Sequence, residues 1–172
     1  MFLIYIKNFL TKKIVNKSLS NVKLISTASK IKTVGIVFDE SYFYEREALV
    51  QELVKEGIEE NDIKVLVFKD KIKKNEVFDY PTFCNKDLSW TATFSKSEVV
   101  NFINENFDLL INYYDVEKIP LLLLSNETKA SFKVGFSAID KRLNHFMINT
   151  NAENYTVFID ELFKYLKILN KI

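Results

Sequence analysis

Short apolar segments recur along the chain and are separated by longer segments with helical periodicity. The clearest apolar run is TVGIVF at 33–38, which is followed by Asp39. A nearly continuous run of this kind is typical of a strand buried on both faces of a sheet, and the alternating run SFKVGF at 131–136 also fits a strand. The predicted strands are 33–38, 63–68, 107–113, 131–136 and a short 146–149.

Helices are predicted between and after these strands. Ser41 is expected to cap the first helix and Gly57 to end it, because serine favours N-caps and glycine favours C-terminal caps. The sequence Ser95-Lys-Ser-Glu98 has the spacing of a capping box, and Pro120 suits a first helical turn. The predicted helices are 42–56, 95–105, 119–129 and 154–169.

Strands that alternate with helices imply a mostly parallel sheet with helices on both faces. We therefore predict an open, Rossmann-like or flavodoxin-like α/β sheet of about five strands, preceded by a basic N-terminal helix. The chain of 172 residues is long enough for one such domain. We assign the domain to residues 31–172, and residues 1–30 to the N-terminal helix and a connector.

The segment 69–93 does not follow this pattern. It contains Pro81, Cys84 and Trp90 among scattered polar residues, and it shows no clear period. A long irregular segment in a compact domain is either functional or conceals a short strand. The sequence is compatible with both interpretations.

The start of the chain predicts a short basic amphipathic helix over 2–16 and a polar connector over 18–29. Charge is unevenly distributed, because residues 1–38 carry seven lysines and no acidic residue, whereas the remaining residues carry a net charge of −6. The chain therefore combines a basic arm with an acidic body. The apolar stripe of the predicted helix consists of Leu3, Ile6, Leu10 and Ile14.

A basic helix with an apolar stripe suits an anionic membrane surface, an RNA backbone or ribosome, or an acidic protein. Alternatively, the helix packs on its own domain and its lysines face water. No apolar run approaches the roughly 20 residues of a membrane span. The opening segment also lacks the cleavage site of a signal peptide, so we expect a cytoplasmic protein, with peripheral attachment to a membrane as an alternative. The candidate contacts to an anionic surface are Lys7, Lys12, Lys13 and Lys17.

Glycine, cysteine and histidine are scarce, which excludes several kinds of site. The three glycines, Gly35, Gly57 and Gly135, cannot form a glycine-rich phosphate loop. The single Cys84 cannot form an internal disulfide or a cysteine-rich zinc site, and we expect it to be a small buried residue. Catalysis by a Ser–His or Cys–His pair would depend on His145, whose position is more typical of a structural histidine. No cofactor and no dedicated metal site is predicted.

Two aspartates directly follow predicted strands or come close to their ends. These are Asp39 and Asp115, and in open α/β sheets ligands bind at the carboxyl ends of the strands. If the two strands are neighbours, the carboxylates could share a cleft and hold a metal ion or act as acid and base. The turn after 131–136 adds Ser137, Asp140 and Arg142 as groups that could recognise an anion. Alternatively, the aspartates cap the following helices and the turn is solvated.

Several segments carry a resemblance to a known family. They are FDLLINYY at 107–114, FKVGF at 132–136, FMI at 146–148 and LFKYLKILN at 162–170. In these segments the chain resembles a family of small uncharacterised proteins, a domain of unknown function, from Bacteroidota-type bacteria. The resemblance covers most of the chain and implies a cytoplasmic α/β protein. It implies no activity and no site residues.

The leading hypothesis is a non-enzymatic binding or interaction domain that engages an anionic surface or partner through its lysine-rich N-terminal segment. The alternative is a small-ligand-binding or enzymatic α/β domain with a cleft at the carboxyl ends of the strands, near Asp39 and Asp115. A third hypothesis is a structural subunit that buries its aromatic surface in an oligomer.

Overall fold

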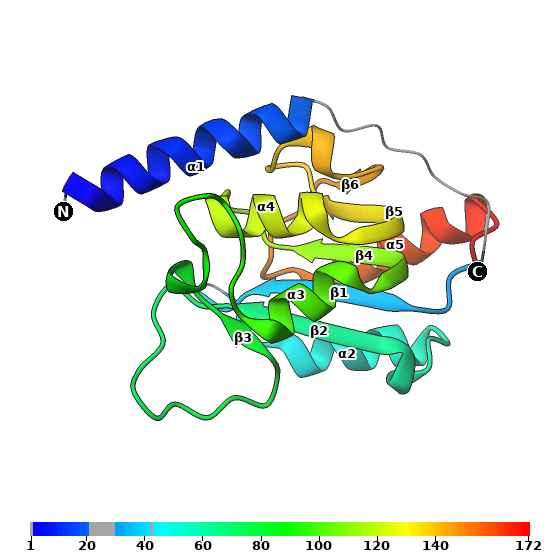
Figure 1. Ribbon diagram of the computed structural model, residues 1–172. Coiled ribbons are helices and arrows are strands. Elements are labelled where there is room, and N and C mark those ends of the chain that lie inside the picture. The colour runs from blue at the N-terminus through cyan, green and yellow to red at the C-terminus, as the bar shows by residue number, and fades with distance from the viewer. Residues whose placement is uncertain (1, 21–29, 42) are drawn as a thin grey trace.

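Six parallel strands form a single open sheet (Figure 1). The computed structural model describes residues 2–20, 30–41 and 43–172, and within the first helix the side chains of residues 9 and 11–20. The strand order is β3-β2-β1-β4-β5-β6, which is the Rossmann order and not the flavodoxin order. The predicted α/β class is confirmed. The strands are β1 (Val34–Asp39), β2 (Ile63–Phe68), β3 (Thr82–Phe83), β4 (Asn106–Tyr113), β5 (Lys129–Phe136) and β6 (Phe146–Ile148).

Helices cover both faces of the sheet (Figure 1). Helices α2 and α5 pack on one face, whereas α1, α3 and α4 contribute to the core on the opposite face. Three short 3-10 turns lie at Glu60–Asp62, Asn85–Asp87 and Lys141–Leu143. The five α-helices of the described residues are α1 (Phe2–Ser20), α2 (Arg46–Lys55), α3 (Ser97–Asn104), α4 (Ile119–Glu127) and α5 (Tyr155–Ile168).

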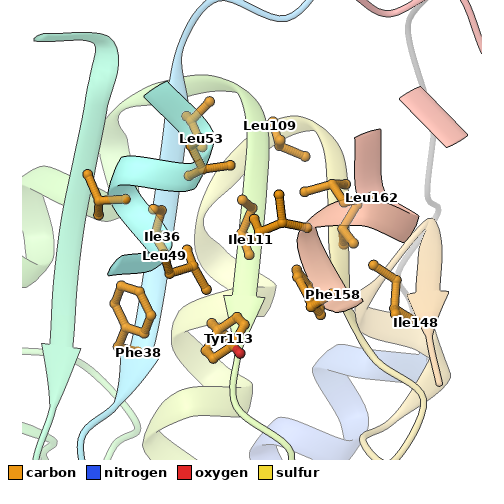
Figure 2. Close-up of a cluster of buried hydrophobic side chains, with 14 of the residues drawn as sticks. Ile36, Phe38, Leu49, Leu53, Leu109, Ile111, Tyr113, Ile148, Phe158 and Leu162 are labelled. Carbon is orange, nitrogen blue, oxygen red and sulfur yellow. The ribbon is translucent and has the colours of Figure 1, made fainter. Parts of the chain in front are cut away.

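The central strands supply most of the core. Every residue of β1 is buried, as expected for the apolar run at 33–38. Phe38 of β1 and Tyr113 of β4 lie together on the face covered by α2 and α5 (Figure 2). The ring of Tyr113 also meets Phe158 of α5 edge-on, with 5.1 Å between the ring centroids. This aromatic cluster fixes α5 against the middle of the sheet.

The segment 69–93 contains a strand that the sequence did not reveal. Strand β3 has two residues and pairs with Val67 and Phe68 of β2. Leu88 of this segment also forms an isolated antiparallel bridge with Phe94, the residue that follows the segment. The predicted number of strands was therefore too low by one, because two residues are too few to show a period.

Two predicted helix starts are wrong, whereas one predicted helix end is confirmed. The N-cap of α2 is Glu45, so Ser41 does not cap this helix. The N-cap of α3 is Lys96, so Ser95 does not open a capping box. Gly57 follows the end of α2 with a φ of 100°, a conformation that favours glycine.

The side of α1 that faces the domain differs from the predicted stripe. Thr11, Val15 and Leu19 are buried, and α1 contacts α4 and the Lys141–Leu143 turn. Ile14, which belongs to the predicted stripe, is 41% exposed. Apolar residues occur around the whole helix, so spacing alone did not identify the buried side. The side chains of the other stripe members, Leu3, Ile6 and Leu10, lie outside the described part of the structure.

A chain of buried polar groups lies within the core next to α4. The Asn112 amide donates to Asn144 Oδ1 at 2.8 Å and accepts from the Ser125 hydroxyl at 2.7 Å. The Ser125 hydroxyl also bonds to the Tyr114 hydroxyl at 2.7 Å. Gly135 leaves room for this chain, because a Cβ atom at that position would lie 2.6 Å from Asn144 Nδ2.

We predict that Gly135→Ala destabilises the protein by about 1–3 kcal/mol, because the new methyl group displaces the Asn144 amide from its hydrogen bond. Urea unfolding followed by circular dichroism measures the change. Ser131→Ala, in the same strand but outside the polar chain, is the matched control. Equal losses in the two variants would contradict this account.

Candidate functional site

The strand order reverses between β1 and β4. Strands β2 and β3 lie on one side of this pair, and β5 and β6 lie on the other. In open α/β sheets, ligands bind outside the carboxyl ends of the strands at such a switch point. The residues that follow β1 and β4 therefore surround the position where a ligand is expected.

Lys118 spans the switch point. It is the N-cap residue of α4, and its ammonium nitrogen lies 2.7 Å from Asp39 Oδ2 at the end of β1. It also donates to Ser41 Oγ at 2.8 Å and to Asp70 Oδ2 at 3.1 Å. The same ammonium lies 5.1 Å from the centroid of the Phe68 ring. One lysine thus joins the residues that follow β1 and β2 to the start of α4.

This ion pair is well shielded from water. Asp39 is 4% exposed, and its other carboxylate oxygen accepts the Ser41 N–H at 3.0 Å. In a dinucleotide-binding protein, the connection after β1 is a glycine-rich loop that approaches a phosphate. Here that connection carries Asp39, Glu40 and Glu45 and has no glycine. The acidic groups disfavour a phosphate at this place.

The structure does not join Asp39 and Asp115 in one cluster. The Asp115 carboxylate accepts the Ala152 N–H at 3.0 Å, in the segment that precedes α5. Asp39 contacts the start of α4 instead, and α4 and α5 cover opposite faces of the sheet. Each aspartate holds a loop to the sheet. Neither caps the helix that directly follows it, because the N-caps of α2 and α4 are Glu45 and Lys118.

The predicted anion-binding turn is internally paired. Asp140 is the N-cap of the Lys141–Leu143 turn and accepts the Arg142 N–H at 2.9 Å. The Arg142 guanidinium also binds the Asp140 carboxylate, which lowers the pKa of that carboxyl below its usual value. The Ser137 hydroxyl donates to Asn149 Oδ1 at 3.1 Å. These contacts are those of a self-contained turn.

A cavity of about 530 Å³ lies at the carboxyl ends of β2 and β3. It is lined by residues that follow β2, by residues that follow β3 and by Lys96 at the start of α3. Cys84 and the irregular segment 69–93 stand out in the sequence, but no cavity was predicted there. Charged and apolar side chains both line the cavity, and they include Asp70, Lys71, Ile72, Cys84, Lys86 and Lys96.

The surface of α1 that points away from the domain combines apolar and basic residues. Phe9 is 70% exposed, and Ile14 is also exposed. Lys12, Lys13 and Lys17 are exposed as well, whereas the side chain of Lys7 lies outside the described part. Figure 1 shows α1 lying across the α4 side of the domain with its N-terminal end projecting beyond it.

Two kinds of site are absent from the residues that the structure describes. No group of three or more histidine, cysteine, aspartate or glutamate side chains is arranged to hold a metal ion among them. Within the same residues, no helix has the length and apolar character needed to cross a membrane.

Comparison with known proteins gives a family. A model of a family of unknown function, DUF6913, matches residues 7–169, which is nearly the entire chain. The chain belongs to the DUF6913 family. No curated protein and no solved structure matches this DUF6913 member.

His145 and Cys84 of this DUF6913 member have the environments that the sequence predicted. His145 Nδ1 accepts the Lys133 N–H at 2.9 Å, and its ring stacks on Phe132. Cys84 is buried. His145 therefore links β5 to the start of β6.

Lys133 is the buried titratable group that sequence analysis missed. Its ammonium donates to the Ser125 carbonyl at 2.6 Å and lies 3.4 Å from the Asn126 carbonyl, near the end of α4. A cation is favourable at the carboxyl end of a helix. Burial nevertheless lowers the pKa of Lys133 to about 8. The signal was present in the sequence, since a lysine in the middle of a predicted buried strand requires polar partners.

We predict that Asp39→Ala destabilises the DUF6913 domain by about 2–4 kcal/mol, because it leaves the Lys118 ammonium without its closest carboxylate. The double variant Asp39→Ala/Lys118→Met should be more stable than Asp39→Ala, because it also removes the ammonium that has lost its closest carboxylate. Chemical unfolding of the wild type, both single variants and the double variant measures the coupling. Additive losses would exclude an energetically coupled pair.

We also predict that the stability of this protein rises between about pH 8 and pH 10 through Lys133. The unfolded chain binds the lysine proton up to its ordinary pKa of about 10.4, whereas the folded chain releases it near pH 8. The unfolded state therefore binds more protons in this window, and the free energy of unfolding increases with pH. Below pH 8 both states are protonated and this contribution is constant.

Urea unfolding from pH 7 to pH 9.5 tests this dependence in the wild type and in Lys133→Met. The variant should lose the rise. Lys129→Met, which removes an exposed lysine from the same strand, should retain it. An unchanged pH dependence in Lys133→Met would show that another group is responsible.

Proposed function

We propose that this protein is a non-enzymatic interaction domain that attaches peripherally to an anionic lipid surface through α1. The observation that carries the proposal is the pairing of exposed apolar and basic residues on a helix whose opposite side is already buried. Phe9 and Ile14 supply the apolar contacts, and Lys12 and Lys13 supply the charge. Helices that lie in the membrane interface also carry exposed apolar residues beside lysines, although α1 does not gather its apolar residues on one face.

The orientation of α1 supports the proposal. Thr11, Val15 and Leu19 fix one side of the helix in the core. In addition, the Asn126 amide donates to Ser18 Oγ at 2.6 Å and ties α1 to the end of α4. The exposed residues are therefore presented on a held helix, so little conformational entropy is lost on binding.

The exposed apolar residues favour a lipid surface over RNA or an acidic protein. A phosphate backbone draws mainly on the lysines. Phe9, at 70% exposure, could stack on an unpaired RNA base, but the aliphatic Ile14 would gain little from RNA. At a bilayer, phenylalanine enters the boundary between headgroups and acyl chains, while lysine stems extend toward the lipid phosphates. Both residue types are then used.

Charge distribution supports one orientation on the membrane. Residues 1–38 carry seven lysines without an acidic residue, and the rest of the chain has a net charge of −6. Four of the seven lysines, Lys7, Lys12, Lys13 and Lys17, belong to α1, so an anionic surface attracts this helix and repels the acidic body. Each lysine contributes about 1 kcal/mol at such a surface, and binding is consequently reversible and sensitive to salt. We infer a cytoplasmic location for the domain, in a Bacteroidota-type bacterium, at the inner face of the membrane.

We predict that the full chain sediments with phosphatidylglycerol-containing vesicles and not with phosphatidylcholine vesicles. Lys12→Gln/Lys13→Gln should weaken binding roughly thirtyfold at physiological salt, as expected for the loss of two lysine contacts. Phe9→Ser/Ile14→Ser should weaken it as well, because the apolar contacts are lost. Vesicle sedimentation over a lipid titration gives the partition coefficients.

The matched control is Lys73→Gln/Lys74→Gln, which removes the same charge from two exposed lysines outside α1. It should bind like the wild type. If the control variant bound vesicles as weakly as Lys12→Gln/Lys13→Gln, the loss of binding would reflect the net charge of the protein and not contacts made by α1. If the protein bound an RNA homopolymer, and this binding depended on Lys12 and Lys13 but not on Phe9 and Ile14, RNA and not lipid would be the partner of α1.

A further inference from the structure

The cavity at the carboxyl ends of β2 and β3 is independent of α1 and of the proposed lipid contact. Its volume of about 530 Å³ lies within the range of small-molecule sites, roughly 300–1,000 Å³. It also lies at the carboxyl ends of the strands, where α/β proteins bind ligands. Its position is next to β2 and β3, and not at the switch point between β1 and β4.

The acidic residues of the cavity are already engaged. Asp87 Oδ2 accepts the Cys84 N–H at 2.7 Å. Asp70 Oδ2 accepts from the Lys118 ammonium at 3.1 Å. Asp70 is therefore paired with a cation from outside the cavity lining, and Asp87 holds the start of the Asn85–Asp87 turn.

The lysines of the cavity have N–H donors that no group in the described part of the protein uses. Across the described residues, no hydrogen bond or ion pair holds the ammonium groups of Lys71 and Lys86. Lys96 is half-buried, and its ammonium is positioned by a 2.6 Å hydrogen bond to the Thr82 carbonyl. An ammonium group has three donors, so Lys96 retains two for a ligand. Three lysines thus line the cavity beside two carboxylates, one of which, Asp70, is paired with Lys118.

We propose that this cavity binds a small organic phosphate. Lysine acts as a point charge toward phosphate, and the cavity has no arginine of the kind that pairs with a planar carboxylate. Lys96 is the N-cap of α3, so the positive end of this helix borders the cavity. Ile72 and Cys84 provide apolar wall for the carbon skeleton of the ligand.

Cys84 provides a direct readout, because it is the only cysteine of the chain and it lines the cavity, so a ligand there covers the 6% of Cys84 that is exposed. The rate of its modification by methyl methanethiosulfonate is measured in the full chain with ribose 5-phosphate. At a concentration ten times the dissociation constant, the rate should fall about tenfold, in proportion to the empty fraction of sites. Ribose and sodium chloride at matched ionic strength should not protect, and inorganic phosphate should protect more weakly.

Variants test the role of the lysines. Lys86→Met, at an exposed position, should weaken protection by ribose 5-phosphate about tenfold, and Lys86→Arg should preserve it. Lys74→Met, an exposed lysine of the neighbouring loop outside the cavity lining, is the matched control and should leave the dissociation constant unchanged. Thermal unfolding without ligand verifies that each variant is folded.

Three results would overturn the proposal. They are an absence of protection by any phosphate at millimolar concentration, equal protection by citrate and ribose 5-phosphate, and equal weakening in Lys86→Met and Lys74→Met. None of these results bears on the vesicle experiment, which depends on residues of α1.

Discussion

Burial of both faces of the central strands is the constraint on which the rest of the structure depends. Every residue of β1 is buried, so each face of the sheet must be covered by helices. Helices α2 and α5 cover one face, and α1, α3 and α4 cover the other. The candidate sites lie where the chain leaves the sheet, as the Asp39–Lys118 pair and the neighbouring cavity do. Polar groups inside the sheet, such as Asn112 and Lys133, are buried and find their partners within the core.

The fold could be predicted from the sequence because its signals are local. A strand such as β1 shows its burial in six consecutive residues. Strand β3 showed nothing of the kind, because its two residues belong to the sheet only through β2. The buried side of α1 was also hidden, since it depends on the position of α4 and not on the spacing of apolar residues within the helix.

The candidate sites were harder to predict because their residues come from distant parts of the chain. The position of Asp39 at the carboxyl end of a strand was predicted. Its partner Lys118 was not predicted, because nothing in the local sequence distinguishes this lysine from the others. Lys96 reaches the cavity from the start of a helix that follows a long loop. Such proximity depends on the strand order, which the sequence did not provide.

The shortness of β3 has a consequence for the solubility of the domain. Because β3 pairs with Val67 and Phe68, the first half of β2 lies at the margin of the sheet. A margin of this kind can recruit a strand from another molecule. Two features oppose such growth here: Lys64 of β2 forms an ion pair with Glu105 at 2.7 Å, and Pro81 precedes β3 with no N–H to donate. The Lys64–Glu105 ion pair and Pro81 thus disfavour edge-to-edge aggregation through the unpaired half of β2.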